Sequence, residues 1–386
     1  MYEFSTPMPY TKEHINKLFE INNKVGKSCI NTVYFSLPAN STDFVGFEQG
    51  RFSWEFITDF NYWKPLIEHS LDKGADFIYL LNSPKIYNPE FDNVDLMLEK
   101  LDKLLNNLKT LGCNKVRVCN PQLIAYLNKY YPDIEIYLST SAELQSIKQY
   151  ANLFEMFNTI KEFVPSWDLN KNFRFLKNIR KRFPNIKLEL MVNEGCIPSC
   201  PIRTAHNIFI TGVGLEKLVN NIFSRQFYIK HCSHIKAINF NWYLCNANII
   251  YPWEINEYSK IGINNFKLVG RNTSSFNTGE YIKFYELYLK GIDNIKNIEN
   301  EPIRYFNHYL VENKNINSTI RDIKPFLPKI SHFKKNGHLC ATKYGIDCTY
   351  CKKCAEKMQN FFNLKKEKEI KNNKLICAMN DFSIKA

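Results

Sequence analysis

The chain has 386 residues, of which 45% are hydrophobic, and this composition can bury a large globular core. No apolar run reaches the roughly 18 residues that a membrane helix needs. The N-terminus has neither the basic start nor the apolar stretch of a signal peptide, so we expect a cytoplasmic protein. The net charge of +13 admits an anionic partner such as RNA, although lysine forms no dominant block outside 355–375.

The first part of the chain alternates between short apolar strands and amphipathic helices. The predicted strands are 2–6, 31–37, 76–81, 115–119, 135–139, 160–165, 187–192 and 265–269. The near-continuous apolar run of the third strand is typical of a parallel sheet that is covered on both faces. Eight strand–helix units in about 290 residues predict a (β/α)8 barrel. We interpret a further strand-like run at 237–242 as an insertion.

Three parts are expected along the chain. Residues 1–295 form the barrel, and residues 296–335 are a polar, proline-punctuated linker or helical connection. Residues 336–386 form a cysteine-rich, metal-binding C-terminal module that ends in a lysine-rich tail.

Two thiols, Cys196 and Cys200, follow the seventh strand in a loop stiffened by prolines. Sites in such barrels form at the carboxyl ends of strands, where this loop lies. With Cys232 and Cys245 they make four thiols whose spacing fits no compact zinc finger, whereas iron–sulfur clusters also take four thiolates. For the isolated pair, the alternative is two small apolar side chains in a turn.

A second set of cysteines is much more compact and lies near the C-terminus. Its members are Cys340, Cys348, Cys351 and Cys354. Successive two-residue gaps between three thiols, with a fourth nearby, are a strong indication of a metal site. The spacing leaves a second [4Fe-4S] cluster and a structural zinc ion both open.

Three other residues are candidates for chemistry at the barrel mouth. Glu194, beside the first cysteine, either acts as an acid or base or caps the turn. His206 either binds an anionic substrate or has a structural role. Arg271 follows the eighth strand, and its planar guanidinium suits a carboxylate or phosphate.

Four segments, in order, resemble the U32 collagenase-like peptidase family: YEFSTPMP, EIYLSTSAEL, KLELMVNEGC and GINNFKLVGR. The resemblance spans residues 1–295 and implies a [4Fe-4S] cluster held by four cysteines, which correspond here to Cys196, Cys200, Cys232 and Cys245. The family histidine before the first cysteine is replaced in this chain, and the last two cysteines of the set are farther apart. We therefore expect a divergent member.

Relatives in this family look like oxygen-independent hydroxylation factors that act on RNA bases or quinone precursors. The resemblance therefore implies an iron–sulfur redox enzyme of hydroxylase type, with an electron donor or protein partner. Its substrate is an RNA base, a quinone precursor, a peptide or a small molecule. The alternatives are a peptidase or hydrolase with a structural metal site and a non-catalytic RNA-binding subunit.

Overall fold

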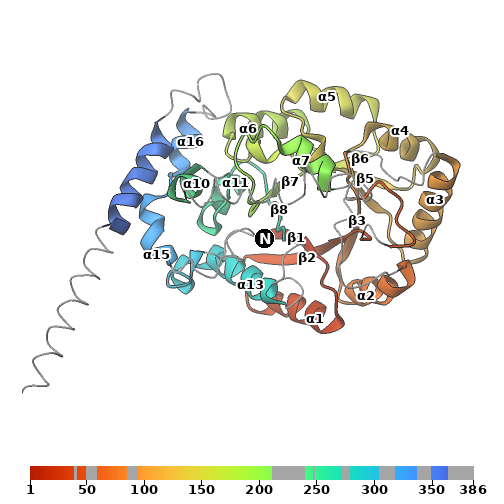
Figure 1. The fold of residues 1–386 in the computed structure, drawn as a ribbon, viewed down its shortest axis with the longest axis horizontal. Coiled ribbons are helices and arrows are strands. Elements are labelled where there is room, and N and C mark those ends of the chain that lie inside the picture. The colour runs from red at the N-terminus through yellow and green to blue at the C-terminus, as the bar shows by residue number, and fades with distance from the viewer. Residues whose placement is uncertain are drawn as a thin grey trace, which may run out of the picture.

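A closed barrel of eight parallel strands forms the centre of the protein, and β8 pairs with β1 to complete it (Figure 1). The computed structural model describes residues 1–38, 41–48, 59–84, 94–210, 240–246, 248–270, 279–303, 318–336 and 349–363. The strands are β1 (Tyr2–Pro7), β2 (Ser28–Phe35), β3 (Asp76–Leu81), β4 (Lys115–Val118), β5 (Glu135–Leu138), β6 (Ile160–Phe163), β7 (Lys187–Met191) and β8 (Asn265–Lys267). This topology confirms the predicted (β/α)8 barrel.

Helices surround the barrel and cover its outer face (Figure 1). The longer ones are α1 (Lys12–Glu20), α2 (Phe60–Asp72), α3 (Val94–Thr110), α4 (Pro121–Tyr130), α5 (Ile147–Met156), α6 (Phe173–Arg182), α7 (Arg203–Ile210) and α13 (Glu280–Asp293). Shorter ones are α10 (Phe240–Asn246), α11 (Ile255–Ser259), α15 (Ile320–Ile323) and α16 (Ile330–Asn336), and a further helix spans 350–363. Several begin at a side-chain cap, as where Asn120 accepts from two backbone N–H groups of α4.

The predicted strand at 237–242 is wrong in its described part, because Phe240–Asn246 is helical. Three consecutive residues, Tyr243, Leu244 and Cys245, are each 1% exposed. The aromatic residues of this run favour a strand locally. A helix that is packed on more than one side buries them equally well, and here those tertiary contacts override the local preference.

The strands carry two different sets of side chains, since successive residues point to opposite faces. One set packs under the helices in the main core. The other set points into the barrel, where Tyr34, Ile78, Leu80 and Tyr137 form a small separate apolar cluster. Barrel interiors are usually filled with branched apolar residues. In this barrel charged side chains occupy part of that space.

The described C-terminal segments pack against the barrel. Ile320 and Ile323 of α15, Phe333 of α16 and Met358 of the helix 350–363 all belong to the main apolar core. The amide of Asn241 in α10 donates to Gln359 at 2.6 Å. These helices lie together on one side of the barrel (Figure 1).

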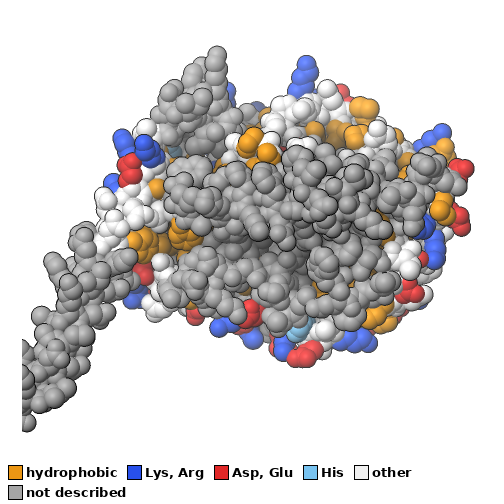
Figure 2. Space-filling model, viewed as in Figure 1, with side chains coloured by type: hydrophobic (Ala, Val, Ile, Leu, Met, Phe, Trp, Pro, Cys, Tyr) orange, Lys and Arg blue, Asp and Glu red, His pale blue; other side chains and the backbone are white. Residues whose placement is uncertain are grey.

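None of the described helices combines the length and apolarity that crossing a membrane requires. Around the edge of the face shown in Figure 2, described Lys and Arg side chains alternate with Asp and Glu. On the described part of this face, the positive net charge therefore does not gather into one basic patch.

A buried carboxyl group makes the stability of the fold depend on pH. Glu48 is fully buried and accepts hydrogen bonds from the backbone of Gly46, at 2.9 Å, and from the hydroxyl of Tyr79, at 3.0 Å. Burial raises its pKa from 4.5 to about 7 against these hydrogen bonds. The folded state then binds a proton that the unfolded state has released, so stability falls as the pH rises from about 4.5 to about 7.

We expect Glu48→Gln to remove this dependence. Relative to the wild type, the variant should gain about 2 kcal/mol of unfolding free energy between about pH 5 and about pH 8. Urea unfolding at both pH values measures it, with Glu20→Gln, an exposed position, as the matched control. A constant difference between Glu48→Gln and the wild type would contradict the assignment.

Candidate functional site

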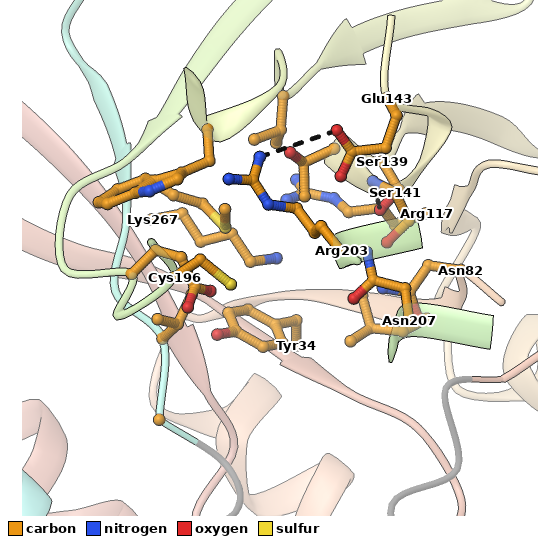
Figure 3. Close-up of a pocket in the computed structure, with 18 residues that line it drawn as sticks. Tyr34, Asn82, Arg117, Ser139, Ser141, Glu143, Cys196, Arg203, Asn207 and Lys267 are labelled. Carbon is orange, nitrogen blue, oxygen red and sulfur yellow. Dashed lines mark hydrogen bonds and ion pairs between the residues drawn. The ribbon is translucent and has the colours of Figure 1, made fainter. Parts of the chain in front are cut away.

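A cavity of about 100 Å³ lies at the carboxyl ends of the strands (Figure 3). One water needs about 10–15 Å³ of such space, so the cavity has room for several waters or one small organic ion. Its lining is about half polar and half apolar, and it includes Tyr34 of β2, Arg117 of β4 and Lys267 of β8. The loops after β5, β6 and β7 supply much of the rest. This is where barrel enzymes place their chemistry.

The loop 192–202 between β7 and α7, called here the thiol loop, carries Cys196 and Cys200. Cys196 lines the cavity, and both thiols are partly exposed. The side chain of Asn193 holds the start of the loop, accepting from Val269 N at 2.8 Å and donating to Val269 O at 3.0 Å. The carboxylate of Glu194 accepts from the N–H of Gly195 at 2.7 Å, as a turn cap does.

An ion pair between Asp168 and Arg203, called here the clamp, holds the far side of the thiol loop. Arg203 donates to the two carboxylate oxygens of Asp168 at 2.8 and 3.1 Å, and to the carbonyl of Ile197 at 2.8 Å. Asp168 also accepts from the backbone N–H of Ser199 at 2.9 Å. Ser199 has a φ of 51°, which a non-glycine residue adopts only at a cost. The clamp therefore fixes a loop conformation that the chain would not keep unaided.

Arg203 also places positive charge beside a thiol. Burial lowers its pKa, but the bonds to Asp168 and the interaction with Cys196 outweigh burial and raise the pKa above its ordinary value. The guanidinium therefore stays cationic and favours the thiolate form of Cys196. Figure 3 shows Arg203 reaching toward Glu143, 3.9 Å away.

Beneath the cavity lies the charged floor, made of Arg117, Glu162 and Glu189. Arg117 is 1% exposed; it donates to Glu189 at 2.6 Å and to Glu162. The hydroxyl of Ser5 donates to Glu189 at 2.6 Å. Buried charges need this kind of mutual pairing to offset their desolvation.

The two glutamates of the floor differ in protonation. Burial, followed by the charge of Glu189, raises the pKa of Glu162 to about 7 against the neighbouring cations. For Glu189, Arg117 and Lys267 outweigh burial and lower the pKa below its ordinary value. Near neutral pH, Glu162 is therefore the carboxyl group that exchanges a proton.

Lys267 of β8 also lines the cavity. Its ammonium group is 3.6 Å from the ring centroid of Tyr34, a close cation–π contact. The hydroxyl of Tyr34 donates to the carbonyl of Leu268 at 2.7 Å, which fixes the ring. In Figure 3 the Lys267 amine and the Cys196 thiol point toward the interior of the same pocket.

The structure separates Cys245 from the thiol loop. Tyr243, two residues earlier on α10, donates to the carbonyl of Gly195 at 3.0 Å, whereas the Cys245 sulfur is 3.9 Å from the carbonyl of Phe326. Residues two apart on a helix point in nearly opposite directions. Cys245 interacts electrostatically with Cys354 instead.

The remaining predicted residues divide as follows. Cys351 and Cys354 lie on the helix 350–363, which packs next to α10, and Cys351 is buried. His206 lies on α7, one turn after the clamp arginine and outside the cavity lining. Cys232, Arg271, Cys340 and Cys348 fall outside the described residues. Within the described ranges, no three or more His, Cys, Asp and Glu side chains are arranged to hold a metal ion.

Sequence reasoning missed several residues that build the site: Tyr34, Arg117, Glu143, Asp168 and Lys267. A usable signal was present for two of them. Arg117 in KVRVC and Lys267 in NFKLV are single charges inside otherwise apolar strands. A charge in such a strand has to point into a polar interior or pair with another charge.

Comparisons with known proteins agree with the sequence motifs. The model of peptidase family U32 matches residues 90–199, which reach into the thiol loop. An uncharacterized protease of Methanocaldococcus jannaschii is 22% identical over 345 residues, covering 89% of this chain and 92% of the relative. Among solved structures, the U32 peptidase Mk0906 aligns with a TM-score of 0.47 and 12% identity, over 71% of this chain and 94% of that one.

A GH113 β-1,4-mannanase aligns with a TM-score of 0.36 and 14% identity, over 74% of this chain and 97% of that one. TM-scores below 0.5 carry no argument about this protein. The barrel fold is established by the pairing of its strands. The family match, the Methanocaldococcus relative and the four sequence motifs together support the resemblance of the chain to peptidase family U32.

Proposed function

We propose that the chain is an iron–sulfur enzyme that carries out an oxygen-independent hydroxylation or related redox modification. The observation that carries this proposal is the thiol loop. It brings two cysteines to the mouth of the barrel, with Cys196 in the cavity wall. A loop fixed at both ends by side-chain hydrogen bonds is the kind of support that a thiolate ligand needs.

The residues fit the proposed cluster in part. Cys196 and Cys200 share one loop and suit two ligand positions of a [4Fe-4S] cluster. Cys245 faces the C-terminal helix and does not join them in the described arrangement. Cys232 remains the predicted third ligand. When bound, such a cluster would supply single electrons at the edge of the cavity.

Residues of the chain itself would hold the thiol ligand, supply positive charge and exchange a proton beside such a cluster. Arg203 favours the thiolate of Cys196, and the clamp keeps the thiol loop in place. Lys267 and Arg117 supply positive charge in the cavity wall. Glu162, which exchanges a proton near neutral pH, is linked to the cavity through Arg117.

Iron and acid-labile sulfide content of anaerobically purified protein tests the proposal. Cys196→Ser and Cys200→Ser should each lose about four irons per chain. Cys29→Ser is the matched control, because Cys29 lies at the start of β2, at the opposite end of the barrel. Unchanged iron in both thiol-loop variants would sink the cluster assignment. Cys245→Ser shows in the same assay whether that thiol belongs to the set.

A second function class is tested with the same material, since relatives are named proteases. A peptidase with a structural metal predicts cleavage of unfolded protein substrates that survives oxidative loss of iron. The redox proposal predicts no such cleavage.

A further inference from the structure

The contact between α10 and the helix 350–363 (dark blue in Figure 1) brings two thiols together. On α10, Asn241 and Cys245 are four residues apart and therefore lie on the same face. The amide of Asn241 donates to Gln359 of the C-terminal helix at 2.6 Å. This face of α10 is therefore turned toward the C-terminal helix, and Cys245, which is 1% exposed, is buried there.

The helix 350–363 carries a thiol on the side that it turns toward the barrel. Cys351, Ala355 and Met358 are buried in the main apolar core. Their spacing is that of one helical stripe. Cys354, three residues after Cys351, belongs to the same stripe and is partly buried against the core. The C-terminal helix thus presents Cys354 toward the elements on which it packs.

The electrostatics of the two thiols show that they are neighbours. Burial, followed by the charge of Cys354, raises the pKa of Cys245 to about 12, while Lys171 acts to lower it. Burial also raises the pKa of Cys354, against the charge of Lys357 and a hydrogen bond to Tyr350. Two buried thiols that resist ionisation lose their protons readily to a bound metal ion, whose charge replaces the lost hydration.

The position of Cys245 disagrees with the ligand set that the family resemblance implies. Tyr243 of α10 contacts the thiol loop at Gly195, and Cys245 points away from it. Cys245 lies instead beside a member of the compact C-terminal set of cysteines, whose spacing indicates a metal site. Each of the two sites would then draw on thiols that its own surroundings bring together.

We propose that Cys245 and Cys354 bind one thiophilic metal centre between α10 and the helix 350–363, so that Cys245 belongs to the C-terminal metal site and not to the barrel cluster. Zinc and the iron of iron–sulfur clusters are the centres that thiolates prefer, and each takes four ligands. The pair supplies two of these, one from each helix. The metal would fasten the C-terminal helix to α10, which also contacts the thiol loop through Tyr243.

Zinc, iron and acid-labile sulfide content of the anaerobically purified full chain test the proposal. Cys245→Ala and Cys354→Ala should each lose the same metal, and the double variant should lose no more than either single variant. Cys113→Ala is the matched control, because Cys113 is also a buried thiol of the main core. Loss of zinc alone identifies a single ion, and loss of iron with sulfide identifies a cluster. Wild-type metal content in both single variants would overturn the proposal.

A second double variant separates this site from the barrel cluster. If the two sites are independent, Cys196→Ser combined with Cys245→Ala should lose the sum of what the single variants lose. A combined loss no larger than that of Cys196→Ser alone would place Cys245 in the barrel cluster and overturn the proposal. Unchanged iron in Cys196→Ser together with metal loss in Cys245→Ala would reject the barrel cluster and keep this site.

Alkylation of Cys354 by N-ethylmaleimide gives a readout that does not depend on counting metal. Cys354 is partly exposed, so a bound metal should be what protects it in the wild type. We expect faster alkylation of Cys354 in Cys245→Ala, and equal rates in the two proteins once the metal has been removed. Urea unfolding checks that the variant remains folded. Equal rates before metal removal would show that Cys245 does not share a metal with Cys354.

Discussion

Arg117→Met is expected to lower the free energy of unfolding by about 3–5 kcal/mol, because it leaves two buried carboxylates without their shared cation. Glu162 and Glu189 are 2% and 4% exposed, so water cannot replace the lost partner. The pKa of Glu162 would rise further above its unfolded value, and the pKa of Glu189, which Arg117 helps to hold below its ordinary value, would rise as well. The loss should therefore be larger at about pH 8 than at about pH 5. Urea unfolding at both pH values measures it.

A control variant and a variant that should restore stability accompany Arg117→Met. Lys148→Ala, an exposed position on α5, should change stability by less than about 0.5 kcal/mol. Adding Glu162→Gln and Glu189→Gln to Arg117→Met removes the unpaired charges and should restore part of the lost stability, mainly at the higher pH. If the triple variant is no more stable than Arg117→Met, the loss comes from packing and not from charge.

The barrel could be predicted from the sequence because its signals are local. Each strand is a short apolar run, each helix carries its own periodicity, and the alternation of the two fixes the fold class. The predicted strand at 76–81 matches β3 at both ends, and the other strands agree to within two residues at each end, except that β2 starts three residues before its predicted start. At β8 the predicted strand runs two residues too far, into the loop tied to Asn193.

The charged floor could not be predicted in the same way. Arg117 is 45 residues from Glu162 and 72 from Glu189 along the chain. Each lies on a different strand, and only closure of the barrel brings the three together. A single charge inside an apolar strand shows that a partner is needed, but nothing in the local pattern says which one.

The resemblance predicts that Cys245 is a cluster ligand, but the direction of its side chain depends on the secondary structure of the run that carries it. In α10, residues two apart point in nearly opposite directions. Tyr243 contacts Gly195, and Cys245 turns toward Phe326. The spacing of cysteines in the sequence does not fix this direction.

Asp168→Asn is expected to cost about 2–3 kcal/mol of unfolding free energy and to loosen the thiol loop. The substitution leaves the buried guanidinium of Arg203 without its carboxylate, since Glu143 is 3.9 Å away. Asparagine keeps one oxygen that can accept from the N–H of Ser199, but its NH2 group opposes the donors of Arg203, so the side chain should shift and Ser199, whose φ is 51°, should relax toward a more common conformation. Stability and thiol geometry should change together.

Two measurements separate these effects, with Asp72→Asn, an exposed position, as the matched control. Urea unfolding gives the stability, and the rate of Cys200 alkylation in iron-free protein reports the loop. We expect faster alkylation of Cys200 in Asp168→Asn and unchanged alkylation of Cys29, which a general loss of stability would not produce. A variant that loses stability while Cys200 reacts as in the wild type would assign Asp168 to the fold alone. Asp168 lies on the loop after β6, and the thiols lie on the loop after β7. Faster alkylation would therefore also show that the loop after β6 holds the thiols of the loop after β7 in position.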